Sequence, residues 1–281
     1  MRRVRGKIAM KKIPCSVEIL TFNNEKTIRR TLESVKDFDE IVIVDGGSTD
    51  GTLAIAREYG CAIISQDMAC KNEDGTIKDF AAARNQGLAR ARNVWFLFVD
   101  SDEYMGAGVV REIGDVARGN ATPAGYFVPR KYVFDGRMIE CALAYPSFQM
   151  RLFHKDAAEK FIKEVHERIK LKNGTETRRL AKPMFVPISV DIRALRKKQE
   201  RYIAIEQKRE GNISIGRFLF LFYHQIKTIM LYLFRMARNA IGCHGSRLPF
   251  SYEWGMILYH FKLCAAFARC VRIRKQTWIK A

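Results

Sequence analysis

The fold is restricted most by a regular alternation, over the first hundred residues, of short apolar runs with stretches of helical periodicity. The apolar runs occupy residues 16–20, 41–44, 62–65 and 95–99. Between the first two runs, Ile28, Leu32 and Val35 recur at helical spacing, and residues 79–92 form a later helical stretch. This alternation predicts an α/β fold, in which a mostly parallel sheet is flanked by helices.

Polar side chains follow three of these runs at the point where each predicted strand ends. They are Thr21, Asn23 and Glu25 after the first run, Asp45 and Ser48 after the second, and Asp100 and Asp102 after the fourth. In open α/β sheets, ligands bind beyond the carboxyl ends of the strands. We therefore expect the three groups to converge on one crevice.

The pair Asp100 and Asp102 suggests a metal site. Carboxylates two positions apart leave a strand end on the same side of the pleat, where they repel each other unless a cation lies between them. Mg²⁺ and Mn²⁺ suit such a site, because they bind through one or two carboxylates and share their other positions with substrate phosphates. The alternative is a solvated acidic turn.

Four segments, in this order and spacing, resemble glycosyltransferase family 2, whose nucleotide-binding domain has the GT-A fold. They are residues 21–25, 44–51, 83–87 and 98–103. A looser likeness, over residues 145–147, 151–153 and 165–168, points to the bacterial branch that adds glucose or a related sugar to the lipopolysaccharide inner core. The resemblance implies a nucleotide-sugar donor, with a UDP-sugar favoured, and an inverting, metal-dependent transfer to a hydroxyl of a cell-envelope glycolipid.

The resemblance also implies roles for single residues around the donor. Thr21, Asn23 and Glu25 would line the base and ribose pocket, and Asp45 would hydrogen-bond the base. Arg84 would approach the base or the diphosphate. The alternatives are turn formation and helix capping for Thr21 and Asn23, and a surface helix charge for Arg84.

At the metal site, the resemblance implies that Asp100 contacts the ribose and the metal and that Asp102 binds the metal. Gly46 stands where many family members have a second Asp, which leaves one carboxylate fewer near the base. Nucleotide binding is therefore better supported than a preference for uracil.

The transfer also needs a base for the acceptor hydroxyl. The second half of the chain has one cluster of carboxylates with a histidine, formed by Glu164, His166 and Glu167. Glu167 best matches the family's His-Glu pair and is the first candidate, Glu164 is the second, and His166 would be a metal or phosphate ligand. A lone histidine in such a run is more often structural.

The formal net charge of +19 indicates an anionic partner without identifying it, because nucleic acid, anionic lipid and a nucleotide diphosphate are all anions. No nucleic-acid-binding module is recognisable, so we expect no nucleic acid partner. A dinucleotide oxidoreductase would need Gly-x-Gly-x-x-Gly after the first strand, where this chain has Thr-Phe-Asn-Asn-Glu. Within the transferases, a polyprenyl-phosphate sugar transferase remains the alternative.

Much of the positive charge lies in the last third, where residues 191–281 hold 18 Lys and Arg against 5 Asp and Glu. The apolar stretches 213–234 and 254–271 carry too many charged and polar residues for a membrane span. Aromatic residues alternate there with Arg and Lys, which favours helices on the anionic inner face of the cytoplasmic membrane. The alternative is that these aromatics are core residues.

The ends and the cysteines suggest a cytoplasmic protein. The basic N-terminus lacks the apolar stretch of a secretory signal, and the seven cysteines show no paired spacing, so we expect free thiols. We divide the chain into a basic tail (1–13), a GT-A catalytic domain (14–190) and a basic helical C-terminal extension (191–281). The catalytic domain would have a nucleotide-sugar half (14–105) and an acceptor half (106–190).

Overall fold

The computed structural model describes residues 11–72, 76–119, 122–164 and 167–271. The chain forms two compact units, and both are discontinuous in sequence. The first unit contains the chain up to Lys131 together with Pro146–Pro187, and the second contains Tyr132–Tyr145 together with the chain from Ile188 onward. The limits expected from the sequence, at residues 14, 106 and 191, remain predictions.

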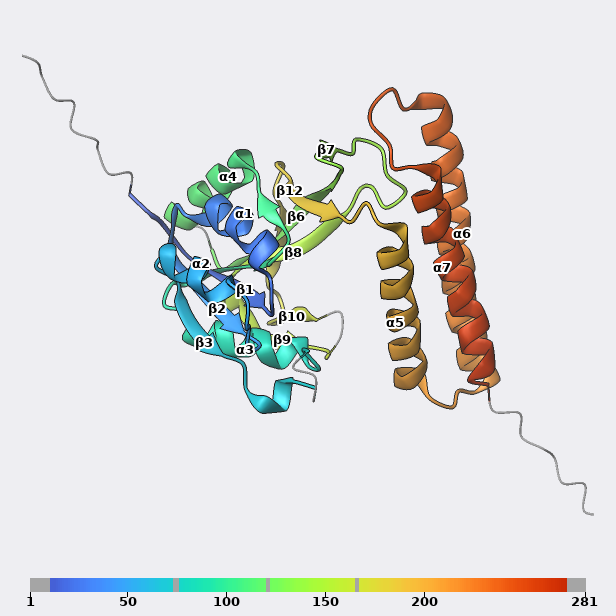
Figure 1. The fold of residues 1–281 in the computed structure, drawn as a ribbon, viewed down its shortest axis with the longest axis horizontal. Helices are drawn as coiled ribbons and strands as arrows, with labels where there is room; N and C mark the ends of the chain where they lie inside the picture. The colour runs from blue at the N-terminus through green and yellow to red at the C-terminus, as the bar shows by residue number, and fades with distance from the viewer. Residues whose placement is uncertain (1–10, 73–75, 120–121, 165–166, 272–281) are drawn as a thin grey trace, which may run out of the picture. The chain divides into compact units, whose positions relative to one another are not determined.

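The first unit is built on a mixed sheet with the strand order β3-β2-β1-β4-β8-β6-β12-β5 (Figure 1). Its parallel part is β1 (Ile13–Thr21), β2 (Phe38–Asp45), β3 (Ala62–Ser65) and β4 (Trp95–Asp100). The antiparallel part begins with β8 (Phe148–His154), between β4 and β6 (Ala124–Phe134). The sheet ends with β12 (Met184–Ile188) and β5 (Tyr104–Met105), and β11 (Glu176–Arg179) pairs with β6. The four predicted strands and the α/β class are confirmed.

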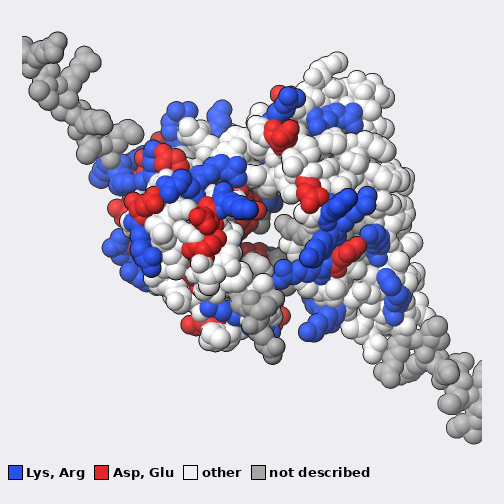
Figure 2. Space-filling view, viewed as in Figure 1, with Lys and Arg blue, Asp and Glu red and all other residues white. Residues whose placement is uncertain are grey.

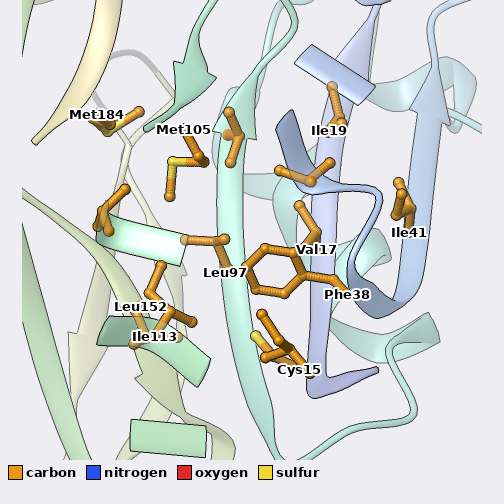
Figure 3. Packing of buried hydrophobic residues seen from close by; sticks show 14 of the residues in the cluster. Cys15, Val17, Ile19, Phe38, Ile41, Leu97, Met105, Ile113, Leu152 and Met184 are labelled. Atoms are coloured by element: carbon orange, nitrogen blue, oxygen red, sulfur yellow. The ribbon is translucent and has the colours of Figure 1, made fainter. Parts of the chain in front are cut away.

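One face of the sheet packs against three helices. These are α1 (Glu25–Val35), α2 (Thr52–Glu58) and α4 (Ala107–Arg118). Val17 and Leu97 of the sheet share a core with Leu32, Ile55 and Ile113 from the three helices, and Figure 3 shows part of this packing. This face is therefore buried along β1 and β4 and in the middle of β2, whereas Ile63 of the edge strand β3 is only partly buried.

The opposite face packs against α3 (Phe80–Arg90), which the sequence places at residues 79–92. Ala83 of this helix packs with Leu20 and Val44 of the sheet. Because successive strand residues point to opposite faces, Glu18 and Asp100 point to the same face as Leu20. The covering helix therefore lies over two carboxylates of the sheet.

Smaller elements complete the first unit. They are the 3₁₀ turns η1 (Met68–Cys70) and η2 (Lys155–Ala157), and the antiparallel pair β9 (Ala158–Ile162) and β10 (Arg168–Leu171). The residues between β9 and β10 bring Glu164 and Glu167 into the unit, one on each side of the undescribed 165–166.

The second unit consists of a hairpin and three helices. The end of β6 pairs with β7 (Arg137–Met138) around Asp135-Gly136, both at positive φ, as a two-residue hairpin turn requires. The helices are α5 (Ile192–Glu210), α6 (Ile215–Gly242) and α7 (Phe250–Arg269), and α7 packs against both of the others (Figure 1). Within the described residues, none of the helices combines the length and the apolar character needed to cross a bilayer.

The prediction that all seven cysteines are free thiols is wrong for two of them. Cys141 of the hairpin segment and Cys243 at the end of α6 form a disulfide, with their Cα atoms 6.4 Å apart. The sequence spacing could not reveal the pair, because 102 residues separate its members. The packing of the hairpin segment brings them together: Ile139 and Tyr145 are buried against Leu248, just beyond α6.

Candidate active site

The register of the sheet places the ends of the three strands that carry the polar groups at one edge. Thr21 at the end of β1 is aligned with Asp45 at the end of β2, and Leu20 is aligned with Asp100 at the end of β4. The loops that carry the candidate donor-binding residues therefore leave the same edge of the sheet, side by side.

The first two loops are joined through Asp45, which is 4% exposed. Its Oδ1 accepts hydrogen bonds from the hydroxyls of Thr21 (2.9 Å) and Ser48 (2.6 Å), and its Oδ2 accepts from the backbone N–H of Gly47 and of Ser48, both at 2.8 Å. A carboxylate has about four acceptor positions. All four positions are used here, so a nucleobase that hydrogen-bonds to Asp45 would have to replace one of these donors.

The exposed residues of the first loop also contact the second loop. The side chain of Asn23 accepts from Thr49 N (2.8 Å), and that of Glu25 accepts from Gly51 N (3.2 Å). Asn23 has φ 54°, in the left-handed region that Asn tolerates better than most residues. Both side chains stabilise the loop pair, which accounts for these polar residues whether or not they also contact a nucleotide.

Gly46 fits its position closely. A Cβ at this residue would lie 3.1 Å from the ring of Phe22 and 3.3 Å from the carbonyl oxygen of Thr21. The Asp that many family members have here would therefore require Phe22 to shift. The absence of the second carboxylate is consistent with the local packing.

Asp100 lies between two buried arginines. Its Oδ1 accepts from Arg84, and its Oδ2 accepts from Arg151 Nη2 at 2.8 Å. Both guanidinium groups also lie over the ring of Phe98, at 5.0 and 4.9 Å from its centroid. The side chains of the two arginines are 1% exposed, so Arg84 is not the surface charge that the sequence left as an alternative.

Further carboxylates complete an arginine–carboxylate network, which we define as the set of ion pairs that includes Asp100. Arg84 also binds Glu18 (2.8 Å) and Glu167 (3.3 Å), and Arg151 binds Glu103 (2.6 Å). Arg130 pairs with Glu103 at 2.7 Å. The members of the network are Glu18, Arg84, Asp100, Glu103, Arg130, Arg151 and Glu167.

The pKa values of two carboxylates in the network, Asp100 and Glu18, are shifted in opposite directions. Partial burial would raise the pKa of Asp100, but the charges of Arg151 and Arg84 outweigh it and hold this pKa well below its usual range. Burial raises the pKa of Glu18 to about 7, against the opposing charge of Arg84. Asp100 is therefore ionised at neutral pH, whereas Glu18 gains and loses its proton near neutral pH.

Close packing explains why Glu18 is so isolated from water. Gly87 of α3 lies directly over it, and a Cβ at this position would come within 2.5 Å of Glu18 Cγ. Glu18 is fully buried, and its Oε1 has no hydrogen-bond partner among the described residues.

The other predicted site residues lie around this network. Asp102 is exposed two residues beyond Asp100, and Glu167 is 15% exposed beside Arg84. Glu164 is exposed, and its carbonyl oxygen accepts from Phe80 N at the start of α3 (2.9 Å). His166 lies outside the described residues.

The described residues contain no group of three or more His, Cys, Asp or Glu side chains arranged to hold a metal. Mg²⁺ and Mn²⁺ need less than that when phosphates supply the remaining ligands. The exposed Asp102 is one such carboxylate, and Asp100, whose side chain is 40% exposed and also accepts from two arginines, lies two residues before it. The residues therefore fit a divalent ion with Asp102 as its ligand and Asp100 beside it.

Four members of the network were not singled out from the sequence as functional: Glu18, Glu103, Arg130 and Arg151. A signal was present for two of them. Glu18 stands inside the apolar run 16–20, and Arg151 stands between Met150 and Leu152. A charge within a buried strand requires a partner, which could have prompted a search for the pair.

Residues 16–169 match the family described as Glycosyl transferase family 2. The chain belongs to this family. The predicted family and its GT-A type fold are therefore confirmed, while the lipopolysaccharide inner-core branch stays a prediction.

Among curated members, the chain is similar to the glycosyltransferase SunS of Bacillus subtilis, with 36% identity over 36% of this chain and 22% of SunS. It is 27% identical to the lipopolysaccharide core biosynthesis glycosyltransferase LpsC of Rhizobium meliloti, over 43% of each chain. A similar solved structure is glucosyl-3-phosphoglycerate synthase of Mycobacterium tuberculosis with Mn²⁺ and UDP, at 23% identity, 46% coverage of each chain and a TM-score of 0.31. The chain spans less than half the length of the curated relatives it matches.

The raised pKa of Glu18 makes the stability of this family 2 domain depend on pH. The native state holds a proton on Glu18 that the unfolded chain releases near its ordinary pKa of 4.5, so this contribution to stability is full below pH 4.5 and is lost as pH rises through about 7. Glu18→Gln should remove it. We expect the free energy of unfolding, measured by urea titration, to fall less between pH 5 and pH 7.5 in this variant than in the wild type.

The matched control is Glu58→Gln, an exposed residue whose pKa is lowered by a hydrogen bond from Arg29 and which is therefore ionised throughout this interval. It should keep the slope of the wild type. Equal slopes in the wild type and Glu18→Gln would show that Glu18 is charged in the native state at pH 5.

Proposed function

We propose that the chain transfers a sugar from a nucleotide-sugar donor, with a UDP-sugar favoured, to a hydroxyl of a cell-envelope glycolipid such as lipopolysaccharide core. The observation that carries the proposal is the placement of the ionised Asp100 and the exposed Asp102 at the sheet edge that also holds Thr21 and Asp45. Membership of glycosyl transferase family 2 supports the reaction class.

The donor would bind along this edge. The paired loops would hold the base and ribose, with Thr21, Asn23, Glu25 and Asp45 in the roles that the family resemblance assigns. Asp100 is fixed by two buried arginines, so its carboxylate has a defined position for a ribose hydroxyl without further ordering. Arg84 would act through Asp100 and Glu167 rather than as an exposed phosphate ligand.

A divalent ion would be held by Asp102, with Asp100 next to it. When bound, such an ion offsets the negative charge that develops on a departing diphosphate. Asp102 is exposed, and the charge of the partly exposed Asp100 is already offset by the two arginines.

Glu167 is our candidate for the base that takes the proton from the acceptor hydroxyl. Arg84 pairs with both Glu167 and Asp100, so the two carboxylates share one partner although 67 positions separate them in the sequence. In an inverting transfer the acceptor oxygen attacks the sugar from the side opposite the departing diphosphate. A general base close to Asp100 and Asp102, where the nucleotide-sugar would bind, could take the proton from that oxygen. Glu164 remains the second candidate, and His166 keeps its proposed role as a metal or phosphate ligand.

For the acceptor, we propose that the second unit docks peripherally on the inner face of the cytoplasmic membrane. Large apolar side chains are exposed on α6 and α7, including Tyr223 (62%), Phe234 (64%) and Phe250 (65%). Figure 2 shows basic side chains over α5 beside a broad uncharged area. Exposed aromatics with nearby Lys and Arg suit an anionic lipid interface, and the similarity to a lipopolysaccharide core glycosyltransferase supports a glycolipid acceptor.

Asp102→Asn should lower metal-dependent hydrolysis and transfer of a UDP-sugar by about 100-fold or more, because a metal ligand typically contributes several kcal/mol to the transition state. The thermal midpoint should not change, since Asp102 is exposed. Activity should disappear in chelator and return with Mn²⁺ or Mg²⁺. Asp115→Asn, at an exposed position of α4, is the matched control and should keep full activity; full activity of Asp102→Asn would exclude the metal site.

Glu167→Gln should lower the catalytic rate by about 10²- to 10⁴-fold, as expected when a general base is removed. Donor affinity, measured by calorimetry with UDP, should change little. Glu164→Gln is the matched comparison. A larger loss in Glu164→Gln than in Glu167→Gln would move the role of the base to Glu164.

Flotation with lipid vesicles tests whether the second unit docks on an anionic membrane. We expect the full chain to bind phosphatidylcholine vesicles that contain phosphatidylglycerol, and to bind less in high salt, because salt screens the attraction. Phe234→Ser should reduce the bound fraction, while Phe148→Ser, at an exposed aromatic of β8 in the first unit, should not. Equal recovery on neutral and anionic vesicles would contradict the electrostatic part of the proposal.

A further inference from the structure

The second unit contains a pocket of ≈ 600 Å³ that lies outside the donor site and shares Phe250 with the proposed membrane surface. Its lining residues come from the C-terminal half of α6, from the connection 243–249 and from the start of α7. Apolar side chains dominate its lining, including Leu233, Met236, Ala240, Leu248 and Phe250. Pockets of small-molecule ligands commonly have this size and this apolar character.

Two charged residues line the same pocket and pair with each other. Arg247 Nη2 donates to Glu253 Oε2 at 3.1 Å, and the side chain of Glu253 is 1% exposed. Among the described residues, the other carboxylate oxygen, Glu253 Oε1, has no hydrogen-bond partner, and neither has Arg247 Nε. A buried polar atom without a partner is unusual in native proteins and calls for an explanation.

The chemistry of these two atoms restricts what could satisfy them. Glu253 Oε1 accepts a hydrogen bond, and Arg247 Nε donates one. A hydroxyl group can do both, because it donates through its proton and accepts through its oxygen. A carboxylate only accepts, so it could satisfy Arg247 but would face the oxygen of Glu253.

We propose that this pocket binds the hydrocarbon chain of a single-chain lipid whose neutral head group places a hydroxyl at the Arg247–Glu253 pair. The apolar lining takes the chain, and the unpartnered atoms of the pair select the head. Phe250, which lines the pocket, stacks on Trp254 with ring centroids 6.1 Å apart, and both are exposed. Aromatic rings of this kind are common where one end of a site is apolar and the other is wet.

The site lies wholly within the second unit, and its occupation requires neither a nucleotide-sugar nor transfer. The inference can therefore fail or hold independently of the proposed function. Binding is the readout, so activity of the enzyme is not needed to test it.

The experiment is calorimetric titration of the full chain with 1-monolauroylglycerol, kept below the concentration at which it aggregates. We expect saturable binding of one molecule per chain, and a shift in tryptophan emission from Trp254. Dodecanoate, which has the same chain length and an acceptor-only head, should bind at least about tenfold more weakly, since a site built for a hydroxyl rejects groups that leave its atoms unpaired. Glycerol alone should not bind.

Two variants test the two ends of the pocket. Ala240→Leu places a larger side chain in the space for the hydrocarbon and should weaken binding by about tenfold or more, while Ala204→Leu, at an exposed position of α5, should not. Glu253→Gln keeps the shape of the side chain but can turn an N–H group toward the pocket, with its oxygen still on Arg247. It should reverse the preference, so that dodecanoate binds better than the monoester, whereas Glu200→Gln, an exposed residue of α5, should keep the original preference.

Non-saturable uptake, or equal affinity in Ala240→Leu and the wild type, would show that lipid adsorbs elsewhere and would overturn the proposal. An unchanged preference in Glu253→Gln, with Ala240→Leu impaired and both variants folded by circular dichroism, would overturn the assignment of the polar end.

Discussion

The compensation of buried charge around Asp100 is the interaction on which the rest of the first unit depends. Two arginine side chains are almost completely buried here, and each is held by carboxylates from different elements. Removing one partner from a buried ion pair typically costs about 3–5 kcal/mol, because it leaves the other charge unpaired. The network therefore fixes the positions of β1, α3, β4 and β8 relative to one another through charge as well as through apolar packing.

The two carboxylates at the sheet edge, Asp100 and Asp45, are both held in place by several donors. Asp100 is ionised and fixed by arginines. Asp45 is fixed by three donors of its own loop, from Gly47 and Ser48, and by the hydroxyl of Thr21 at the end of the neighbouring strand. Both carboxylates belong to the sheet edge, where the strands themselves provide rigidity. The exposed residues Asn23, Glu25 and Asp102 lie on the loops beyond that edge, where a ligand has access to them.

Much of this arrangement could be predicted from the sequence, because it follows from local patterns. Apolar runs predict strands, and the topology of parallel sheets brings their polar ends together. The burial of Arg84 could not be predicted in this way, because an arginine within a helical stretch looks like a surface residue until its partner is known. That partner, Glu18, lies 66 positions away and depends on the close approach of α3 at Gly87. The disulfide between Cys141 and Cys243 was missed for a similar reason, since only tertiary packing makes them neighbours.

The discontinuity of the second unit has a consequence for any attempt to dissect the chain. Residues 132–145 interrupt the family 2 domain in sequence but pack with the C-terminal helices, where Ile139 and Tyr145 are buried against Leu248 and Tyr252. A stop codon after β12 would leave this segment without the surface that covers it and would leave Cys141 without its partner. The family 2 domain therefore cannot be separated from the C-terminal helices by one cut. A variant without the helices would also need residues 132–145 replaced by a short turn. Chimaeras that exchange the helices should exchange this segment with them.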